Sequence, residues 1–204
     1  MNLDEIRQAR TDHPIHELMA RRWSPYVYSN RPVSDDDLRS LFEASRWAAS
    51  SYNEQPWSYI VATNADPAAH AKVLSCLVEG NQEWAAVAPV LAIGCTSLHH
   101  KHNGKRNGAA EHDLGAASFS LALQAVALGL HAHQMIGIHP DRVRELYKVP
   151  EGVEPLTGLA VGYLGKLDDL PEKLRDRDAN GKGRKPLKDF VFGDAWGTTS
   201  TRLG

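Results

Sequence analysis

The chain has 204 residues, 42% of them hydrophobic, which is enough for one substantial core and short for two independent domains. Its 23 basic residues are balanced by 25 acidic ones, so no overall charge draws it to nucleic acid or an anionic membrane. We therefore expect one domain over residues 1–204 that acts on a small molecule, with neither nucleic acid nor a membrane as partner.

The N-terminal segment MNLDEIRQAR is charged, and no run approaches the roughly 20 apolar residues that span a bilayer. We expect a cytoplasmic protein. Cys76 and Cys95 each lie in an apolar run and form no CxxC motif, so both are interpreted as buried small hydrophobic residues. Neither disulfide nor thiol chemistry is predicted.

Local patterns predict an alternation of helices and strands. Pro25 ends the first helix early, since the residue before a proline avoids the helical region. Ser34 is an N-cap, and Gly129 supplies a left-handed C-cap. The predicted elements are helices over 14–22, 35–49, from 66–67, over 113–129 and over 140–147, and strands over 58–63, 90–95, 131–138 and 156–164.

The helix over 113–129 is almost entirely apolar and carries many small residues, which predicts close packing on more than one face. It is expected to be the central helix of an α+β domain with helices packed on a sheet. The segment 166–204 is first highly charged and then carries Phe190, Phe192 and Trp196 without periodicity. Such a tail cannot bury its aromatic residues on itself, so we expect it to wrap a partner subunit.

Motifs of several enzyme classes are absent from the sequence: GxGxxG after a strand, GxxxxGK[ST] and GxSxG. His99, His100 and His102, with His112 further along, are interpreted as solvated side chains of a Lys-rich loop, and no metal site is predicted. No carboxylate pair has apolar flanks that would raise a pKa for acid and base catalysis. An enzyme of this sequence would depend on a cofactor.

Polar and basic residues gather at the ends of the predicted elements. They are Arg21, Arg22 and Ser24, then Ser50, Ser51, Asn53 and Gln55, and finally Lys182, Arg184 and Lys185 in the tail. Each group has an ordinary interpretation, since the first suits a solvated helix C-terminus and the second a simple turn. Only their order and spacing, taken together, set them apart from such ordinary features.

In order and spacing, five blocks of the chain resemble the nitroreductase family. They are RRWSPYVYSNRPVSDDDL, SRWAASSYNEQPWSYIVAT, NQEWAAVAPVLAIGC, DLGAASFSLALQAVALGLHAHQMIGIHP and KGRKPLKDFVFGDAWG. The resemblance covers nearly the whole chain. It implies a nitroreductase-like α+β fold, with a central mixed or antiparallel sheet surrounded by helices, in an intertwined homodimer that binds flavin mononucleotide (FMN).

The resemblance also implies which residues contact the cofactor. They are Arg21, Arg22, Trp23, Ser24 and Tyr26 in the first block, Ser50, Ser51, Asn53 and Gln55 in the second, Asn81, Gln134, Met135, Ile136 and Gly137 at the flavin ring, and Lys182, Arg184 and Lys185 in the tail. The second block would reach the cofactor from the other subunit. The backbone amide of Ile136 would point at flavin N5, where hydride is exchanged, although an ordinary strand end is the alternative.

Two positions bear on activity. Tyr26 stands where the family usually has Arg or Lys beside the flavin, so a cation that stabilises reduced flavin is missing. Trp84 is placed either over the substrate side of the ring or in the core. The resemblance implies an FMN-dependent NAD(P)H oxidoreductase that passes hydride to a nitroaromatic or quinone in a ping-pong cycle. The alternatives are a flavin storage or sensor protein and another flavin reaction, such as dehydrogenation or dehalogenation.

Overall fold

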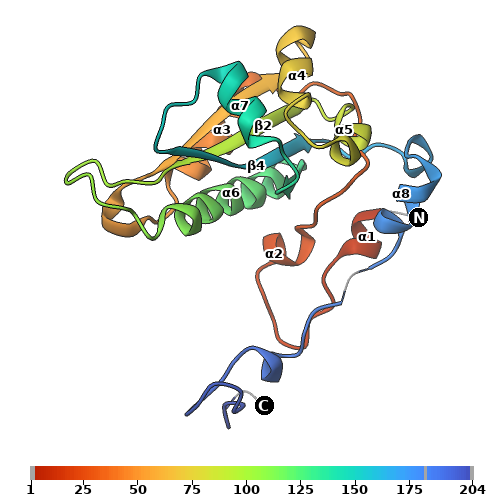
Figure 1. Cartoon of the computed structure of the whole chain (residues 1–204). Coiled ribbons are helices and arrows are strands. Elements are labelled where there is room, and N and C mark those ends of the chain that lie inside the picture. Colours follow the sequence, from red (N-terminus) through yellow and green to blue (C-terminus); the bar gives the residue numbers. More distant parts are fainter. Residues whose placement is uncertain (1–2, 182, 203–204) are drawn as a thin grey trace.

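The computed structural model describes residues 3–181 and 183–202, and it shows helices packed on both faces of one sheet (Figure 1). The helices are α1 Leu3–Arg7, α2 Glu17–Arg21, α3 Asp35–Arg46, α4 Pro67–Leu74, α5 Glu79–Ala85, α6 Ala110–Ala127, α7 Pro140–Tyr147 and α8 Glu172–Ala179. The strands are β1 Trp57–Thr63, β2 Val90–Ser97, β3 His131–Met135 and β4 Val153–Gly162. The predicted α+β class is confirmed.

The sheet has four strands in the order β1-β2-β4-β3, and every neighbouring pair is antiparallel. Side chains alternate between its faces, as in any strand. In β2, Leu91 and Ile93 enter a core with residues of α4, α5 and α7, whereas Val90 and Ala92 enter a second core with α3 and α6. The central strands are therefore buried on both sides, which explains their continuous apolar runs.

Several predicted boundaries are confirmed by the caps that set them. Ser34 Oγ accepts the Asp37 amide at 3.1 Å, Gly129 has a φ of +71°, and α7 begins and ends where the sequence predicts. The helix predicted to reach residue 49 stops at Arg46, because Ala48 N donates to Ser45 O and closes a tight turn. Helices α1, α5 and α8 are absent from the prediction, since each is short and weakly periodic.

Helices α1 and α2 and the C-terminal segment extend from one side of the α/β body (Figure 1). On this side, α1 packs against α8. Within the described residues, no helix is long and apolar enough to cross a membrane.

Gly162 ends β4 against Pro89, where no side chain fits. A Cβ at this position would lie 2.4 Å from Cδ of the proline ring, which cannot move aside. We expect Gly162→Ala to lower the free energy of unfolding by about 2–3 kcal/mol. Gly80→Ala is the matched control, since its Cβ meets nothing within 4 Å and it removes a helical glycine. Denaturant titration of flavin-free protein should show opposite shifts for the two variants.

Both cysteines are buried and unpaired, as predicted: Cys76 is 0% exposed and Cys95 is 3% exposed. Burial raises the pKa of Cys95 to about 11 from a usual value of 9.0. The folded protein therefore keeps this proton where the unfolded chain has lost it, and the resulting stability is complete below pH 9 and lost as pH rises towards 11.

We expect the Cys95 thiol to react about 100-fold more slowly than an ordinary cysteine at pH 8, because only its thiolate is nucleophilic. A colorimetric thiol reagent on a Cys76→Ser variant, which leaves Cys95 as the single thiol, measures this directly. Unfolding in denaturant should release full reactivity. Rapid stoichiometric labelling of the native variant would contradict the buried position.

Candidate functional site

The segment over 22–28 runs along the sheet edge and is held there by a buried carboxylate of α8. Asp178 Oδ2 accepts the backbone amides of Tyr26 at 2.8 Å and Val27 at 2.9 Å. The Asp178 side chain is 0% exposed. Tyr28 also attaches this segment to the sheet. Its backbone forms an antiparallel β-bridge with Leu164, and its hydroxyl donates a hydrogen bond to Ala160 O at 3.0 Å. Helix α8, far away in sequence, thus positions the first predicted cofactor segment.

Three arginines from separate segments, Arg7, Arg22 and Arg184, act on one another electrostatically, and we call them the arginine cluster. Burial and the charges of Arg184 and Arg7 lower the pKa of Arg22. Burial also lowers the pKa of Arg7, which Arg184 lowers further and Asp178 opposes. Arg22 donates to Ser24 Oγ at 3.3 Å. Like charges held together in this way repel one another and favour an anion as their common partner.

The convergence of Arg22 and Arg184 on one phosphate stays a prediction: the two charges act on each other, and Arg184 is exposed on the tail. Lys182 lies outside the described residues, and Lys185 is exposed on the tail. Arg21 is turned aside, since it pairs with Glu17 at 3.3 Å on the surface of α2. Of the predicted basic residues, Arg22 and Arg184 are the two whose charges act on each other, and Arg7 acts on both.

Trp23 is buried beneath α1 at 4% exposure, so only its backbone is placed to face a ligand. Its indole N–H donates to Asp4 Oδ1 at 3.0 Å, and the Arg7 guanidinium lies 4.8 Å from the ring centre. The ring also meets His131 edge-on at 5.5 Å, at the start of β3. Trp23 thus anchors the arginine cluster to the sheet.

Trp84 is also buried, at 2% exposure, and the expectation that it overhangs a substrate is wrong for this structure. It lies among Tyr26 at 5.1 Å, Tyr28 at 6.3 Å and His133 at 4.6 Å between ring centres. Three aromatic neighbours enclose the indole and leave it no open face. The core-packing interpretation of Trp84 is the one observed.

Tyr26 is accompanied by a cation that sequence spacing did not reveal. The Arg177 guanidinium donates to the Tyr26 hydroxyl at 3.2 Å and lies 5.4 Å from the centre of its ring. The Tyr26 ring also contacts the His133 ring, with 4.9 Å between the ring centres. The expectation of a site without charge at this position is therefore corrected, because α8 brings Arg177 to the tyrosine.

The predicted ring-side residues gather where β3 ends. Asn81 Nδ2 donates to Gly137 O at 2.9 Å, which joins α5 to this segment. Ile138 N donates to Ile136 O at 2.7 Å, so the chain turns there and the strand stops at Met135 instead of the predicted residue 138. Ile136 is 81% exposed, so this turn lies at the surface. Met135 is buried, and Gln134 is half-buried.

The second predicted segment, over 50–55, forms a tight turn at the start of α6. Ser51 N donates to Asp113 Oδ2 at 3.0 Å, and Gln55 N donates to Ser50 Oγ at 3.0 Å. Tyr52, Asn53 and Gln55 have positive φ angles of 55°, 53° and 50°. Such left-handed residues are uncommon outside glycine, so a non-glycine run of them marks a locally strained backbone.

The two halves of the predicted site lie at opposite ends of α6. The turn over 50–55 is bonded to Asp113 in the first turn of this helix, whereas Trp23 contacts His131, just beyond its last turn. A helix of 18 residues is about 27 Å long. The structure therefore places the segment with Arg22 and Tyr26 near the C-terminal end of α6 and the turn with Ser50, Ser51, Asn53 and Gln55 at its N-terminal end. Asn81 and Ile136 lie where β3 ends.

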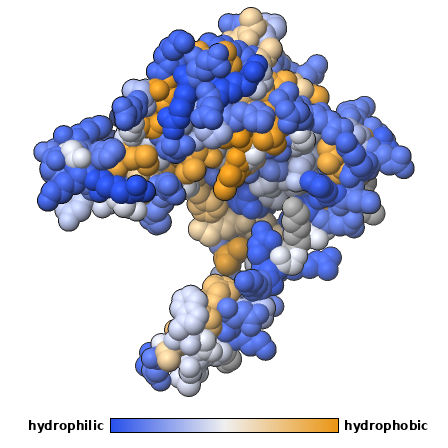
Figure 2. All heavy atoms as spheres, viewed as in Figure 1, coloured by the Kyte–Doolittle hydropathy of each residue, from blue (hydrophilic) through white to orange (hydrophobic). Residues whose placement is uncertain are grey.

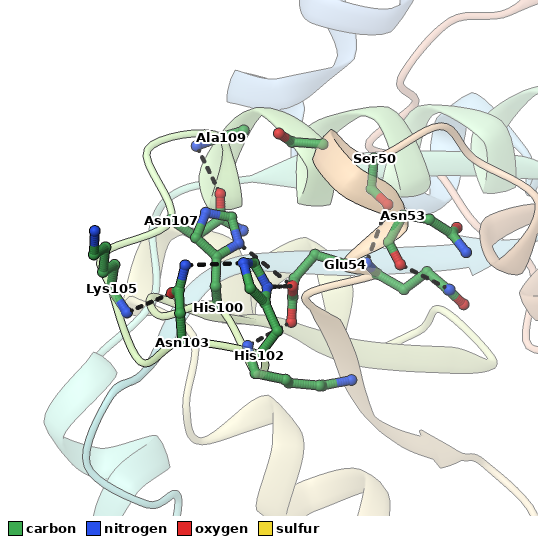
Figure 3. Close-up of polar contacts among 12 residues, drawn as sticks. Ser50, Asn53, Glu54, His100, His102, Asn103, Lys105, Asn107 and Ala109 are labelled. Carbon is green, nitrogen blue, oxygen red and sulfur yellow. Dashed lines mark hydrogen bonds and ion pairs between the residues drawn. The ribbon is translucent and has the colours of Figure 1, made fainter.

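The His-rich loop is not wholly solvated, contrary to expectation. The His100 side chain is 14% exposed, with Nδ1 3.3 Å from Glu54 Oε2, whereas that of His102 is 58% exposed. Glu54, whose side chain is 6% exposed, accepts the Lys101 amide at 2.8 Å (Figure 3). Sequence spacing missed Glu54, Arg7, Arg177 and Asp178, because each becomes significant only through a contact made by folding.

Comparison with known proteins agrees with this architecture. Residues 19–163 match the model of the nitroreductase family. A crystal structure described as an oxidoreductase containing FMN is 35% identical, with a TM-score of 0.86 over 92% of this chain and 95% of that one.

Curated relatives match over most of the same region. A Methanothermobacter thermautotrophicus protein, assigned provisionally as an NADH dehydrogenase/NAD(P)H nitroreductase, is 30% identical over 73% of this chain and 76% of its own. The Bacillus subtilis FMN reductase [NAD(P)H] is 25% identical over 79% of this chain and 66% of its own. The fold, the matched region and these relatives together show that the chain belongs to the nitroreductase family.

Proposed function

We propose that the protein is an FMN-dependent NAD(P)H oxidoreductase that reduces a small acceptor. Bound FMN would supply the redox chemistry by accepting hydride from a reduced nicotinamide and then reducing a nitroaromatic or quinone, in a ping-pong cycle. A visiting nicotinamide needs no dinucleotide-binding fold, which agrees with the missing GxGxxG motif. The related FMN reductase and FMN-containing oxidoreductase support this assignment.

The cluster of Arg7, Arg22 and Arg184 is the observation that carries the proposal. Arg22 and Arg184 fit a phosphate dianion, because Arg forks bind phosphate oxygens in pairs and the anion relieves their mutual repulsion. Arg7, whose Nη1 donates to the Arg177 and Asn180 carbonyls, adds positive charge without a free fork. From His131 beside the cluster to Ile136, the β3 edge extends for about 17 Å, comparable with an outstretched FMN. Arg22 and Ser24 would hold the phosphate end, and Asn81 with the peptide of Ile136 would face the ring.

A homodimer would complete this site. The face of α6 turned away from the body presents Phe119 at 42% exposure and Gly115, above which there is open space. Figure 2 shows apolar residues gathered where Figure 1 draws α6. Two copies related by a two-fold axis across α6 would bring the turn over 50–55 of one chain to the arginine cluster of the other. The exposed Trp196, at 93%, would then pack on the partner with the last part of the tail, over 186–202. The prediction for the whole segment 166–204 is corrected for α8, because Leu174 and Asp178 are buried on their own chain.

A flavin-binding protein with little turnover is the second candidate, since Tyr26 itself carries no charge. Arg177 argues against it. Its guanidinium at the Tyr26 hydroxyl would supply positive charge beside the flavin ring, where reduction adds negative charge. This contact favours an active reductase over a storage protein.

Anaerobic mixing of the purified protein with reduced nicotinamide tests the proposed function. The flavin absorbance should bleach within the mixing experiment, and adding a quinone should restore it. Protein that stays yellow would favour the storage role. A colourless protein that takes up no added FMN would overturn both candidates, and sedimentation of the same sample measures whether it is a dimer.

A further inference from the structure

Two segments far apart in sequence bring three metal-ligand groups together beside the turn over 50–55. Glu54 lies in that turn, and His100 and His102 lie in the loop after β2 (Figure 3). The loop is attached to the carboxylate through the Lys101 amide, 2.8 Å from Glu54 Oε1. This bond also lowers the pKa of Glu54, so the side chain is a carboxylate at neutral pH. The second oxygen, Oε2, faces both imidazoles.

The distances among the donor atoms suit a shared ion. Nδ1 of His100 lies 3.3 Å from Glu54 Oε2, Nδ1 of His102 lies 3.7 Å from the same oxygen, and all three atoms lie within 4.8 Å of one another. Zinc binds imidazole nitrogen and carboxylate oxygen at about 2.0–2.2 Å, which separates tetrahedral ligands by roughly 3.4 Å. The two distances to Oε2 lie on either side of this value.

Hydrogen bonding alone does not account for the arrangement. His100 can donate to Glu54, but the 3.7 Å separation of His102 from the same oxygen is beyond a normal hydrogen bond. His102 Nε2 instead contacts the Asn103 side-chain amide at 2.8 Å, which orients the ring with Nδ1 towards the carboxylate.

An ion could reach this position from solvent and retain an open coordination site. Glu54 and His102 line an open cavity of about 710 Å³ with Tyr52 and Trp57, whereas His100 lies behind them, with its side chain 14% exposed. We propose that Glu54, His100 and His102 bind one divalent transition-metal ion of the zinc type, with water completing its coordination. Two imidazoles and one carboxylate favour such ions over calcium or magnesium, which prefer all-oxygen sites.

Titration of the full-length, flavin-loaded protein with Zn²⁺ and with Co²⁺ tests the site, after chelator treatment and without an affinity tag. We expect one equivalent to bind by calorimetry. Cobalt should give ligand-field absorption at wavelengths beyond the flavin bands. His102→Ala, His100→Ala and Glu54→Gln should each weaken binding at least about tenfold. The glutamine keeps an oxygen that can accept the Lys101 amide.

His139→Ala is the matched control, because His139 also faces a carboxylate, Glu79 at 3.5 Å, on an exposed surface. It should leave affinity and stoichiometry unchanged. His102 is exposed on a loop, so we expect His102→Ala to fold, and circular dichroism checks this. The test therefore remains decisive even if His100→Ala does not fold. No saturable binding to the folded protein, or binding that survives His102→Ala, would overturn the proposal whatever the outcome of the flavin experiments.

Discussion

Replacing Arg22 with alanine should yield a protein that purifies without flavin. A charged hydrogen bond contributes about 1.5–3 kcal/mol, so the single change should weaken FMN binding by about 10- to 100-fold. Arg22→Ala combined with Arg184→Ala should lose more still, because two of the three cluster arginines are then absent. Fluorescence quenching of added FMN by the flavin-free variants measures both effects.

The same change should not destabilise the flavin-free protein, which separates ligand binding from folding. Arg22 is close to Arg184 and Arg7, and its removal relieves like-charge repulsion. Thermal unfolding without ligand should therefore be unchanged or shifted upward, while the stabilisation given by added FMN disappears. Arg39→Ala serves as control, since Arg39 pairs with Asp36 at 2.8 Å on an exposed helix face. Equal FMN affinity in wild type and Arg22→Ala would contradict the phosphate site.

Replacing Asp178 with alanine should have the largest effect on stability. Its carboxylate accepts the amides of Tyr26 and Val27 in a fully buried position, and both donors would be left without this acceptor. The expected loss is about 3–5 kcal/mol of unfolding free energy, as for other broken buried charge contacts. Because this carboxylate positions the segment over 22–28, flavin binding should weaken with it. Denaturant titration and FMN binding measure the two consequences.

Two variants on the same helix make this prediction specific. Asp178→Asn keeps one oxygen acceptor and should recover part of the stability. Asp176→Ala removes an exposed carboxylate two residues earlier in α8 and should change unfolding by no more than about 0.5 kcal/mol. An Asp178→Ala protein as stable as Asp176→Ala would show that α8 does not hold the segment.

Local chemistry made much of the fold predictable. Ser34 and Asp66 cap helices as their sequence positions indicate, and the helix beginning at Pro140 has its predicted bounds. Short helices such as α8 could not be predicted, because their stability comes from tertiary contacts and not from periodicity. Leu174 and Asp178 are buried there within a segment whose composition is almost entirely charged.

In the candidate site, too, residue type was predictable from the sequence and tertiary contacts were not. Arg22 and Arg184 suit phosphate by residue type, and in the fold their charges act on each other. The residues that spacing missed act through contacts across the chain: Arg177 reaches Tyr26 from 151 positions away, and Glu54 meets His100 across 46 positions. No local pattern encodes such distances. Trp84 is the opposite case, since an aromatic residue near a predicted site serves the core.

The separation of the two predicted half-sites by the length of α6 has a genetic consequence. In a two-fold dimer, a chain with Arg22→Ala and a chain with Asn53→Ala would each be inactive alone. Co-expressed, they would form mixed dimers in which one site carries both defects and the other carries neither. Random pairing should then restore about a quarter of the wild-type sites. Two defective alleles would complement each other within one protein, which a site built from a single subunit could never allow.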